Sequence, residues 1–170
     1  MNRKLPASDN QPLEMVTFFL GKILYGIDIV NVQGINKLLD ITPVSQAPEY
    51  VKGLLNLRGQ IITIIDLGKK LGLSSVETNK GSRGIIVKSG SELVGLQVDR
   101  ISDIIYVDQN DIEKPPSNIG AVRSAYFRGV YKGKDDLIGI LNIEKILQTP
   151  EESQAVLDTN RSEKNATPRT

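Results

Sequence analysis

Residues 51–67 read VKGLLNLRGQIITIIDL, and the same pattern returns at 127–143 as FRGVYKGKDDLIGILNI. The two stretches align without gaps, with Gly53 on Gly129 and the final IIDL on the final ILNI. Short runs of aliphatic and β-branched residues, bounded by glycine, asparagine and aspartate, are typical of strands and of the turns that join them. The stretch therefore predicts a strand, a turn and a second strand, and it predicts this element twice.

A second pair of matching blocks precedes the first. ILYGIDIVNVQGI at 23–35 aligns without gaps with ELVGLQVDRISDI at 92–104. Across both pairs of blocks, the matched positions are Leu24 with Leu93, Gly26 with Gly95, Ile27 with Leu96, Ile29 with Val98, Val32 with Ile101, Ile35 with Ile104, Ile62 with Ile138, Ile64 with Ile140 and Asp66 with Asn142. Two blocks repeated in the same order indicate an internal duplication.

The duplication predicts two related units at about 14–73 and 84–147, joined by a linker at 74–83. A unit of about 60 residues is only marginally stable alone, so we expect the two units to pack together. Small closed barrels suit such units, because closure removes exposed strand edges. The fold class expected is all-β, mainly strands with short helices. The polar ends, 1–13 and 149–170, are expected to be flexible.

Composition excludes several kinds of active site. The chain has no histidine and no cysteine, so a Ser-His triad, a histidine base, thiol catalysis and a zinc-cysteine site are impossible. It also has no glycine-rich phosphate-binding motif. The duplication pairs no carboxylates, because Asp28 aligns with Gln97 and Asp66 with Asn142. We therefore expect no catalysis and no cofactor, and we interpret Asp66 and Asn142 as caps of short helices.

Charge and hydropathy limit the partners and the location. The chain has 21 Lys and Arg against 20 Asp and Glu, a net charge of +1. This balance does not favour nucleic acid, whose binders concentrate positive charge, although a small nucleic-acid-binding β-barrel is the alternative function from another class. The N-terminus lacks a signal-peptide pattern, and no apolar run approaches the roughly 20 residues of a membrane helix. We expect a cytoplasmic protein without membrane insertion.

Arg58 is the basic residue whose position raises a functional question. It stands with Gly59 between LLNL and QIITIID, where the glycine is expected to relieve a turn with positive φ. An exposed turn arginine is ordinarily a solvated charge. Arginine is also over-represented in interface hot spots, because its planar fork makes several directed hydrogen bonds. Composition alone does not decide between a solvated charge and a binding residue.

Four blocks of the chain resemble the CheW family in order and spacing. They are FFLGKILYGIDIVNVQGI, APEYVKGLLNLRGQIITIIDL, LVGLQVDRISDII and GILNIEKIL. The resemblance covers residues 14–148. CheW proteins are adaptors that couple bacterial chemoreceptors to the histidine kinase CheA, so the resemblance implies a non-catalytic role in chemotaxis. The implied fold is two tandem five-stranded SH3-like barrels packed together.

The resemblance also implies two binding surfaces. The receptor's hairpin tip is expected to contact Arg58, Val32, Gly34, Ile35, Ile101 and Ile104. The regulatory domain of CheA is expected to dock on the first barrel, at Ile41, Pro43 and Val44. The family commonly has glutamate where this chain has Gly34, so a glutamate contact expected beside the arginine is missing. The implied location is the cytoplasm, with recruitment to membrane-anchored receptor arrays.

Two other relatives share these blocks, a CheV-like fragment and a detached kinase regulatory domain. No receiver domain follows residue 150, and no ATP-binding block precedes residue 14. We therefore expect a free-standing CheW-like adaptor.

Overall fold

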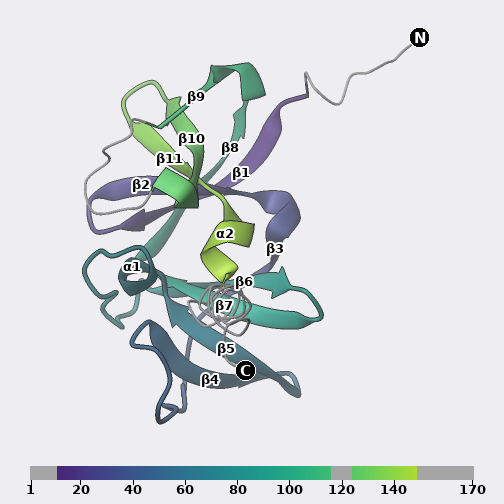
Figure 1. The fold of residues 1–170 in the computed structure, drawn as a ribbon, viewed down its shortest axis with the longest axis vertical. Helices are drawn as coiled ribbons and strands as arrows, with labels where there is room; N and C mark the ends of the chain where they lie inside the picture. Colours follow the sequence, from purple (N-terminus) through teal and green to yellow (C-terminus); the bar gives the residue numbers. More distant parts are fainter. Residues whose placement is uncertain (1–10, 116–123, 149–170) are drawn as a thin grey trace, which may run out of the picture.

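The computed structural model describes residues 11–115 and 124–148, which form two β-sheets stacked along the long axis of the molecule (Figure 1). Two short α-helices lie where the sheets meet. The strands are β1 (Leu13–Leu20), β2 (Ile23–Asp28), β3 (Val32–Asn36), β4 (Val51–Leu57), β5 (Gln60–Asp66), β6 (Arg83–Ser89), β7 (Glu92–Val98), β8 (Arg100–Val107), β9 (Ile112–Glu113), β10 (Phe127–Lys132) and β11 (Leu137–Leu141). The helices are α1 (Leu67–Lys70) and α2 (Ile143–Leu147), and the 3₁₀ turns are η2 (Ile29–Asn31), η3 (Gln109–Asp111) and η4 (Ser124–Tyr126).

The strands of the two repeats are exchanged between the sheets. The six-stranded sheet has the order β8-β1-β2-β11-β10-β9, and the five-stranded sheet has the order β3-β6-β7-β5-β4. In Figure 1 the early strands β1 and β2, in purple, therefore lie beside the late strands β10 and β11, in green. The chain crosses from one sheet to the other after β2, and it crosses back after β7.

This exchange corrects the expected domain boundaries. The sequence predicts one barrel over 14–73 and another over 84–147, but each sheet contains strands from both ranges. The predicted fold class is confirmed: the protein is mainly β, with short helices and two packed SH3-like barrels, although one sheet has six strands where five were expected. The flexible ends expected at 1–13 and 149–170 fall outside the described residues, apart from 11–13, where Leu13 begins β1.

The pairing registers agree with the alignment of the repeats. In the six-stranded sheet, Ile140 of β11 lies opposite Gly26 of β2 in a parallel pair. In the five-stranded sheet, the equivalent Ile64 of β5 lies opposite the equivalent Gly95 of β7, also in a parallel pair. A Cβ on Gly95 would come within 2.6 Å of Ile64 Cδ1, whereas a Cβ on Gly26 would lie 3.4 Å from Ile140 Cδ1, an ordinary contact. The duplication is therefore present in the three-dimensional structure.

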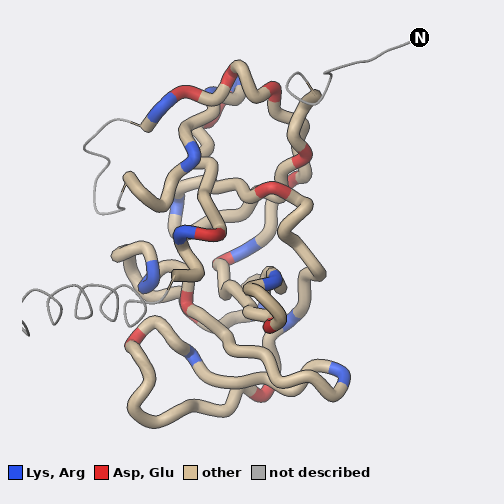
Figure 2. Tube along the Cα trace, turned by 45° about the vertical axis from the view of Figure 1, so that its right-hand side comes forward, with Lys and Arg blue, Asp and Glu red and all other residues tan. Residues whose placement is uncertain are grey.

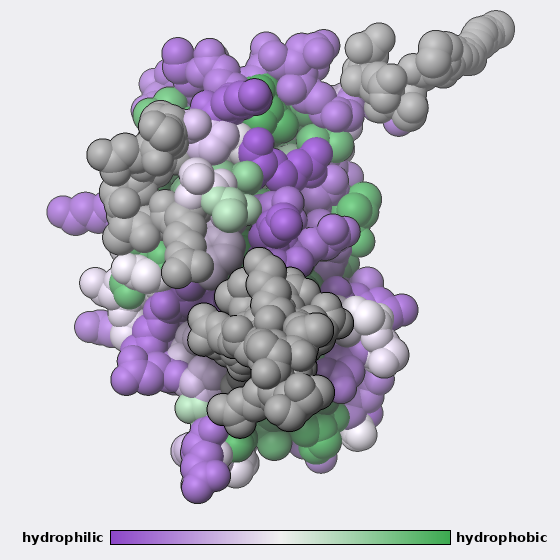
Figure 3. All heavy atoms as spheres, in the orientation of Figure 1, coloured by the Kyte–Doolittle hydropathy of each residue, from purple (hydrophilic) through white to green (hydrophobic). Residues whose placement is uncertain are grey.

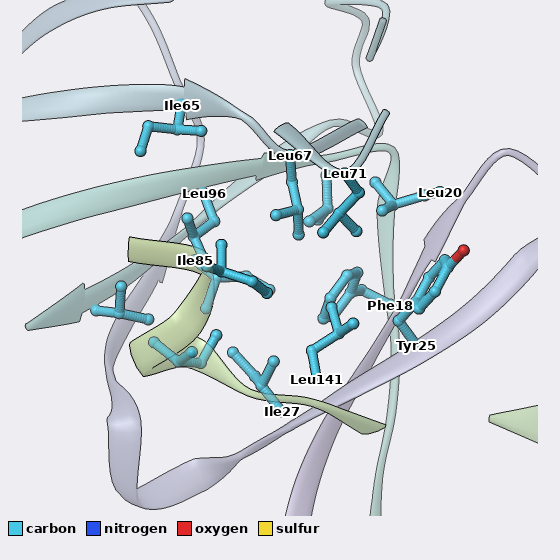
Figure 4. Packing of buried hydrophobic residues seen from close by; sticks show 14 of the residues in the cluster. Phe18, Leu20, Tyr25, Ile27, Ile65, Leu67, Leu71, Ile85, Leu96 and Leu141 are labelled. Carbon is cyan, nitrogen blue, oxygen red and sulfur yellow. The ribbon is translucent and has the colours of Figure 1, made fainter. Parts of the chain in front are cut away.

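A central core joins the two sheets. It combines β1 and β2 of the six-stranded sheet with β5, β6 and β7 of the five-stranded sheet and with both α-helices. Figure 4 shows Phe18 and Ile27 on one side, with Ile85 and Leu96 on the other, directed toward the same space. These four side chains are 0% exposed. Burial of aliphatic and aromatic surface on this scale makes the two sheets one folding unit.

Each barrel also has a smaller core of its own. In the five-stranded sheet it consists of Leu38, Leu55, Ile62, Ile64 and Ile86. In the six-stranded sheet it consists of Met15, Val107, Ile138 and Ile140. Because successive residues of a strand point to opposite faces, strands such as β5 and β6 supply both a barrel core and the central core. This double burial explains why the sequence shows continuous apolar runs there rather than alternation.

The segment at 74–83, expected to be a linker, is held against the fold. Val76 is buried in the central core, and its backbone N–H donates to the Asp66 carboxylate at 3.0 and 3.1 Å. Ser75 Oγ donates to the same carboxylate at 2.6 Å. Asp66 also caps α1 by accepting from Lys69 N at 3.0 Å, and Asn142 caps α2 by accepting from Lys145 N at 3.2 Å. The two predicted helix caps are confirmed.

Candidate functional site

Arg58 occupies the tip of the β4–β5 hairpin. Leu57 pairs with Gln60, so Arg58 and Gly59 form a two-residue turn. Both have positive φ, 54° for Arg58 and 86° for Gly59, which is the φ pattern of a type I′ turn. The Asn56 side chain supports the turn by accepting from Gly59 N at 3.0 Å. The sequence predicted positive φ for the glycine but missed it for the arginine.

A positive φ at arginine is a local strain. The left-handed region costs a non-glycine residue about 1 kcal/mol, and asparagine or glycine fits it better. Arg58 is exposed, and within residues 11–115 and 124–148 its side chain makes no hydrogen bond or ion pair. The strand that follows is rigid, since Ile62 and Ile64 are 0% exposed. The hairpin thus holds an exposed cation in solvent at a stability cost.

β3 is an edge strand of the five-stranded sheet and contains three of the predicted receptor-binding residues. Val32 is partly buried against the central core. Gly34 is partly buried, and a Cβ placed on it would meet only Asn36 Oδ1, at 3.4 Å. Ile35 is 40% exposed. β3 therefore offers an accessible apolar position at Ile35, and a Cβ at Gly34 would make only an ordinary contact.

β8 is the equivalent edge strand of the six-stranded sheet. Ile101 packs on the central core as Val32 does. Ile104 is 51% exposed, and its equivalent Ile35 is 40% exposed. Both strands also contain a register shift against their neighbour, β3 after Val32 and β8 opposite Val16 and Phe18. The structure thus gives the predicted residues of β3 and β8 equivalent places. It sets Arg58 apart, because β3 and β4 are opposite edges of their sheet.

The three predicted kinase-binding residues lie in the segment between β3 and β4. Thr42 forms two backbone hydrogen bonds of 2.8 Å with Leu54, and it thereby extends the sheet beyond β4. Ile41, just before it, packs partly buried on the core of the five-stranded barrel. Pro43 is exposed, and Val44 is 42% exposed. Of the three, Pro43 and Val44 are the accessible ones, whereas Ile41 closes the barrel.

A shallow groove beside the Arg58 hairpin was missed by the sequence analysis. It has a volume of about 420 Å³ and lies between Gln60, Ile61 and Thr63 of β5 and Ser91, Glu92 and Leu93 before and within β7. Ile61 is 64% exposed, although it stands next to the fully buried Ile62. No signal in the run QIITIID separates an exposed isoleucine from a buried one. Ile61 lies on the same face of β5 as Ile65, which packs in the central core. Ile61 is four residues earlier in the strand, and there the core no longer covers that face.

Among the described residues, positively and negatively charged positions are mixed along the chain (Figure 2). Figure 2 shows Lys and Arg positions interspersed with Asp and Glu positions along the trace. On the face shown in Figure 3, hydrophobic residues form separate areas, one of them at the end of the molecule where β4 and β5 lie. Among the described residues, no three acidic side chains are arranged to hold a metal ion. No helix there is long and apolar enough to cross a membrane.

The family model described as the CheW-like domain matches residues 14–151. The chain belongs to the CheW family. Its relatives include the chemotaxis protein CheW of Treponema pallidum, with 35% identity over 155 residues, covering 88% of this chain and 91% of the relative. CheW of Helicobacter pylori is 33% identical over 141 residues, covering 82% and 85%. The resemblance seen in the sequence is confirmed.

A solved CheW structure has the same fold. The crystal structure of the scaffolding protein TtCheW from Thermoanaerobacter tengcongensis matches with a TM-score of 0.76 and 34% identity, covering 87% of this chain and 96% of that one. The comparison therefore extends over both sheets of the CheW fold described above.

Proposed function

We propose that this protein is a non-catalytic adaptor that couples the cytoplasmic tips of chemoreceptors to the histidine kinase CheA in chemotaxis signalling. Membership of the CheW family supports this role, as does similarity to a protein described as a scaffold. The adaptor needs no cofactor, and it works in the cytoplasm, recruited to membrane-anchored receptor arrays. Its activity is to hold two protein partners at once.

The observation that carries the proposal is Arg58. Its side chain is exposed, and its backbone has a φ of 54°. Asparagine at this position would make a more stable type I′ turn. The presence of arginine here despite that preference is explained by a partner that its guanidinium binds, since the planar fork pairs with carboxylates in two parallel hydrogen bonds. We assign that partner as the receptor's hairpin tip.

We assign the edge strands β3 and β8 to a second contact with the receptor tip, separate from Arg58. Ile35 and Ile104 offer exposed apolar side chains from equivalent positions, and Val32 and Ile101 of the same two strands pack partly buried against the central core. Gly34 replaces the glutamate common in the family, so this surface lacks one carboxylate. Receptor preference follows from that difference, because the charge presented beside the apolar contacts is changed.

The kinase-binding surface lies on the segment between β3 and β4. Pro43 and Val44 are the residues we assign to direct contact with the regulatory domain of CheA, with Ile41 supporting them from the barrel core. The segment is fixed by the backbone bonds between Thr42 and Leu54. A fixed segment loses less conformational freedom on binding than a free loop does.

Arg58→Asn tests the adaptor role. The substitution removes the guanidinium and leaves a residue that suits positive φ, so the free energy of unfolding should stay equal or rise by up to about 1 kcal/mol. Binding of a receptor-tip fragment should weaken by about 2 kcal/mol or more, roughly 30-fold, the range of an interface hot spot. Calorimetric titration and urea unfolding measure the two quantities on the same samples.

The matched control is Lys22→Ala. Lys22 is an exposed cation in the two-residue turn between β1 and β2, so it is a hairpin-tip charge on the other sheet. This variant should bind the receptor tip as the wild type does. Arg58→Lys should recover only part of the affinity, because an ammonium lacks the bidentate geometry. Equal receptor affinity in Arg58→Asn and wild type would refute the role of Arg58.

Gly34→Glu is the companion variant. A Cβ at Gly34 would make only an ordinary contact, 3.4 Å from Asn36 Oδ1, so the added carboxylate should change receptor affinity, measured by calorimetric titration, without unfolding the protein.

A further inference from the structure

Asp28 stands at the point where the chain leaves the six-stranded sheet. It is the last residue of β2, and η2 and then β3 follow it into the five-stranded sheet. Its Oδ1 accepts a hydrogen bond from Val30 N at 3.1 Å, which caps η2. Its Oδ2 lies 3.6 Å from Nη1 of Arg128 on β10. One carboxylate thus connects the start of the crossover to a strand of the second repeat.

Arg128 reaches this carboxylate because of a β-bulge. The pairing of β10 with β11 passes from Phe127 directly to Gly129, so Arg128 is the extra residue of the bulge. A bulge re-aims the side chain that it contains. The Asp28 side chain is only 14% exposed and the Arg128 side chain is 38% exposed, so this ion pair is better shielded from solvent than an ordinary surface pair.

The other sheet lacks the pair at the equivalent place. The bulge residue of β4 is Lys52, between Val51 and Gly53, and it forms no ion pair with any described residue. The position equivalent to Asp28 is Gln97, which is 0% exposed and donates to Thr78 Oγ1 at 3.1 Å. The duplicated backbone therefore uses an ion pair at one crossover and a neutral buried amide at the other.

We propose that the Asp28–Arg128 ion pair positions η2 and β3 for receptor binding, which makes Arg128 a positioning residue. The inference rests on the proposed adaptor function. β3 is an edge strand with a single hydrogen-bonded neighbour, β6, and its register shifts directly after Val32. The place of Val32, Gly34 and Ile35 therefore depends on where the strand begins. The ion pair fixes that beginning through the capped η2 turn.

The test compares two ion pairs of the same strand. Lys132 of β10 lies 3.6 Å from Glu113 of β9, the same distance, but its side chains are 70% and 61% exposed and it does not reach the crossover. Arg128→Gln should weaken binding of the receptor-tip fragment about threefold to fivefold, and Lys132→Gln should leave it within about twofold, as expected for pairs of modest strength. Arg128→Lys keeps the charge and should retain most of the affinity.

Hydrogen exchange of the unbound protein supplies a readout that needs no receptor. Amides of residues 30–36 should exchange faster in Arg128→Gln than in wild type, and they should be unchanged in Lys132→Gln. Asp28→Asn keeps an oxygen that can cap η2 but loses the charge, so it should behave as Arg128→Gln does. The double variant Asp28→Asn/Arg128→Gln should be no worse than either single one, because both remove the same interaction.

The outcomes separate the two proposals. If the wild type does not bind the receptor tip, the adaptor function is refuted and the inference falls with it. If the wild type binds, but Arg128→Gln binds equally well and leaves exchange at 30–36 unchanged, only the positioning role is refuted. Equal losses in Arg128→Gln and Lys132→Gln would likewise refute it, because the effect would then be one of surface charge.

Discussion

Each of the two sheets contains one pair of parallel neighbouring strands, and in both pairs a glycine lies opposite an isoleucine. Gly26 faces Ile140 in one, and Gly95 faces Ile64 in the other. The backbone N–H of Asp66, the last residue of β5, donates to Tyr50 O, and that of Asn142, which follows β11, donates to the equivalent Tyr126 O, both at 2.7 Å. The difference between the sheets is in the side chains that surround this common backbone. The duplication therefore preserved hydrogen bonding and close approach, while the side chains diverged.

Of the equivalent positions in the two sheets, the helix caps Asp66 and Asn142 should differ most in the stability lost when each is replaced by alanine. Asp66 is 1% exposed and accepts from Lys69, Ser75 and Val76, whereas Asn142 accepts one side-chain bond from the described part of the chain, donated by Lys145 N. Asp66→Ala should lower the free energy of unfolding by about 4 kcal/mol, because it leaves the buried Val76 N–H unsatisfied and also removes the α1 cap and the bond from Ser75. Asn142→Ala should lower it by about 1 kcal/mol, the usual effect of a lost cap. Urea unfolding measures both, and equal losses would contradict the comparison.

Gly53 and Gly129, which directly follow the bulge residues of β4 and β10, should differ less in the stability lost on substitution. A Cβ on Gly53 would collide with the backbone carbonyl of Thr42, and Gly53 has a φ of 151°, which other residues rarely adopt. A Cβ on Gly129 would lie 2.5 Å from Glu113 O, but its φ is not in the positive range. Gly53→Ala should cost about 3 kcal/mol and Gly129→Ala about 2 kcal/mol, since only the first adds backbone strain to the collision. A larger loss in Gly129→Ala, measured by thermal unfolding, would reverse the order.

The glycines that pair with isoleucine, Gly26 and Gly95, should differ least in the stability lost when each is replaced by alanine. A Cβ on Gly95 would lie 2.6 Å from Ile64 Cδ1, while one on Gly26 would lie 3.4 Å from Ile140 Cδ1. Gly95→Ala should destabilise by about 1 kcal/mol, and Gly26→Ala should stay within about 0.5 kcal/mol. Ile64→Val removes the colliding atom, so the double variant should lose less than the sum of the two single losses. Strict additivity in a double-mutant cycle would show that Cδ1 is not the cause.

The repeat itself was predictable because its signals are local. Glycine is required wherever a neighbour approaches too closely for a side chain, and it marks those places in both copies. Asp66 and Asn142 precede their helices directly, so their capping role needs no knowledge of the rest of the fold. The mainly β class follows in the same way from short apolar runs separated by turn residues.

The candidate site was predictable in part. The resemblance to the CheW family supplied its residues, and the structure places those of β3 and β8 at equivalent positions on two edge strands. The positive φ of Arg58 was not predictable, because an arginine gives no local signal for the left-handed region. Ile41 was expected as a contact residue, but its partial burial against the barrel core follows from the pairing of Thr42 with Leu54.

The sequence by itself determined the duplicated strands, their glycines, their caps and the absence of histidine and cysteine chemistry. Only the tertiary structure decided that β3 pairs with β6 while β8 pairs with β1, so that each barrel takes strands from both repeats. The physical reason is that the two copies are alike. A strand's apolar pattern states that it must be buried, but it does not distinguish between two equivalent neighbours. That choice depends on the central core, which is complete only when both sheets pack on it.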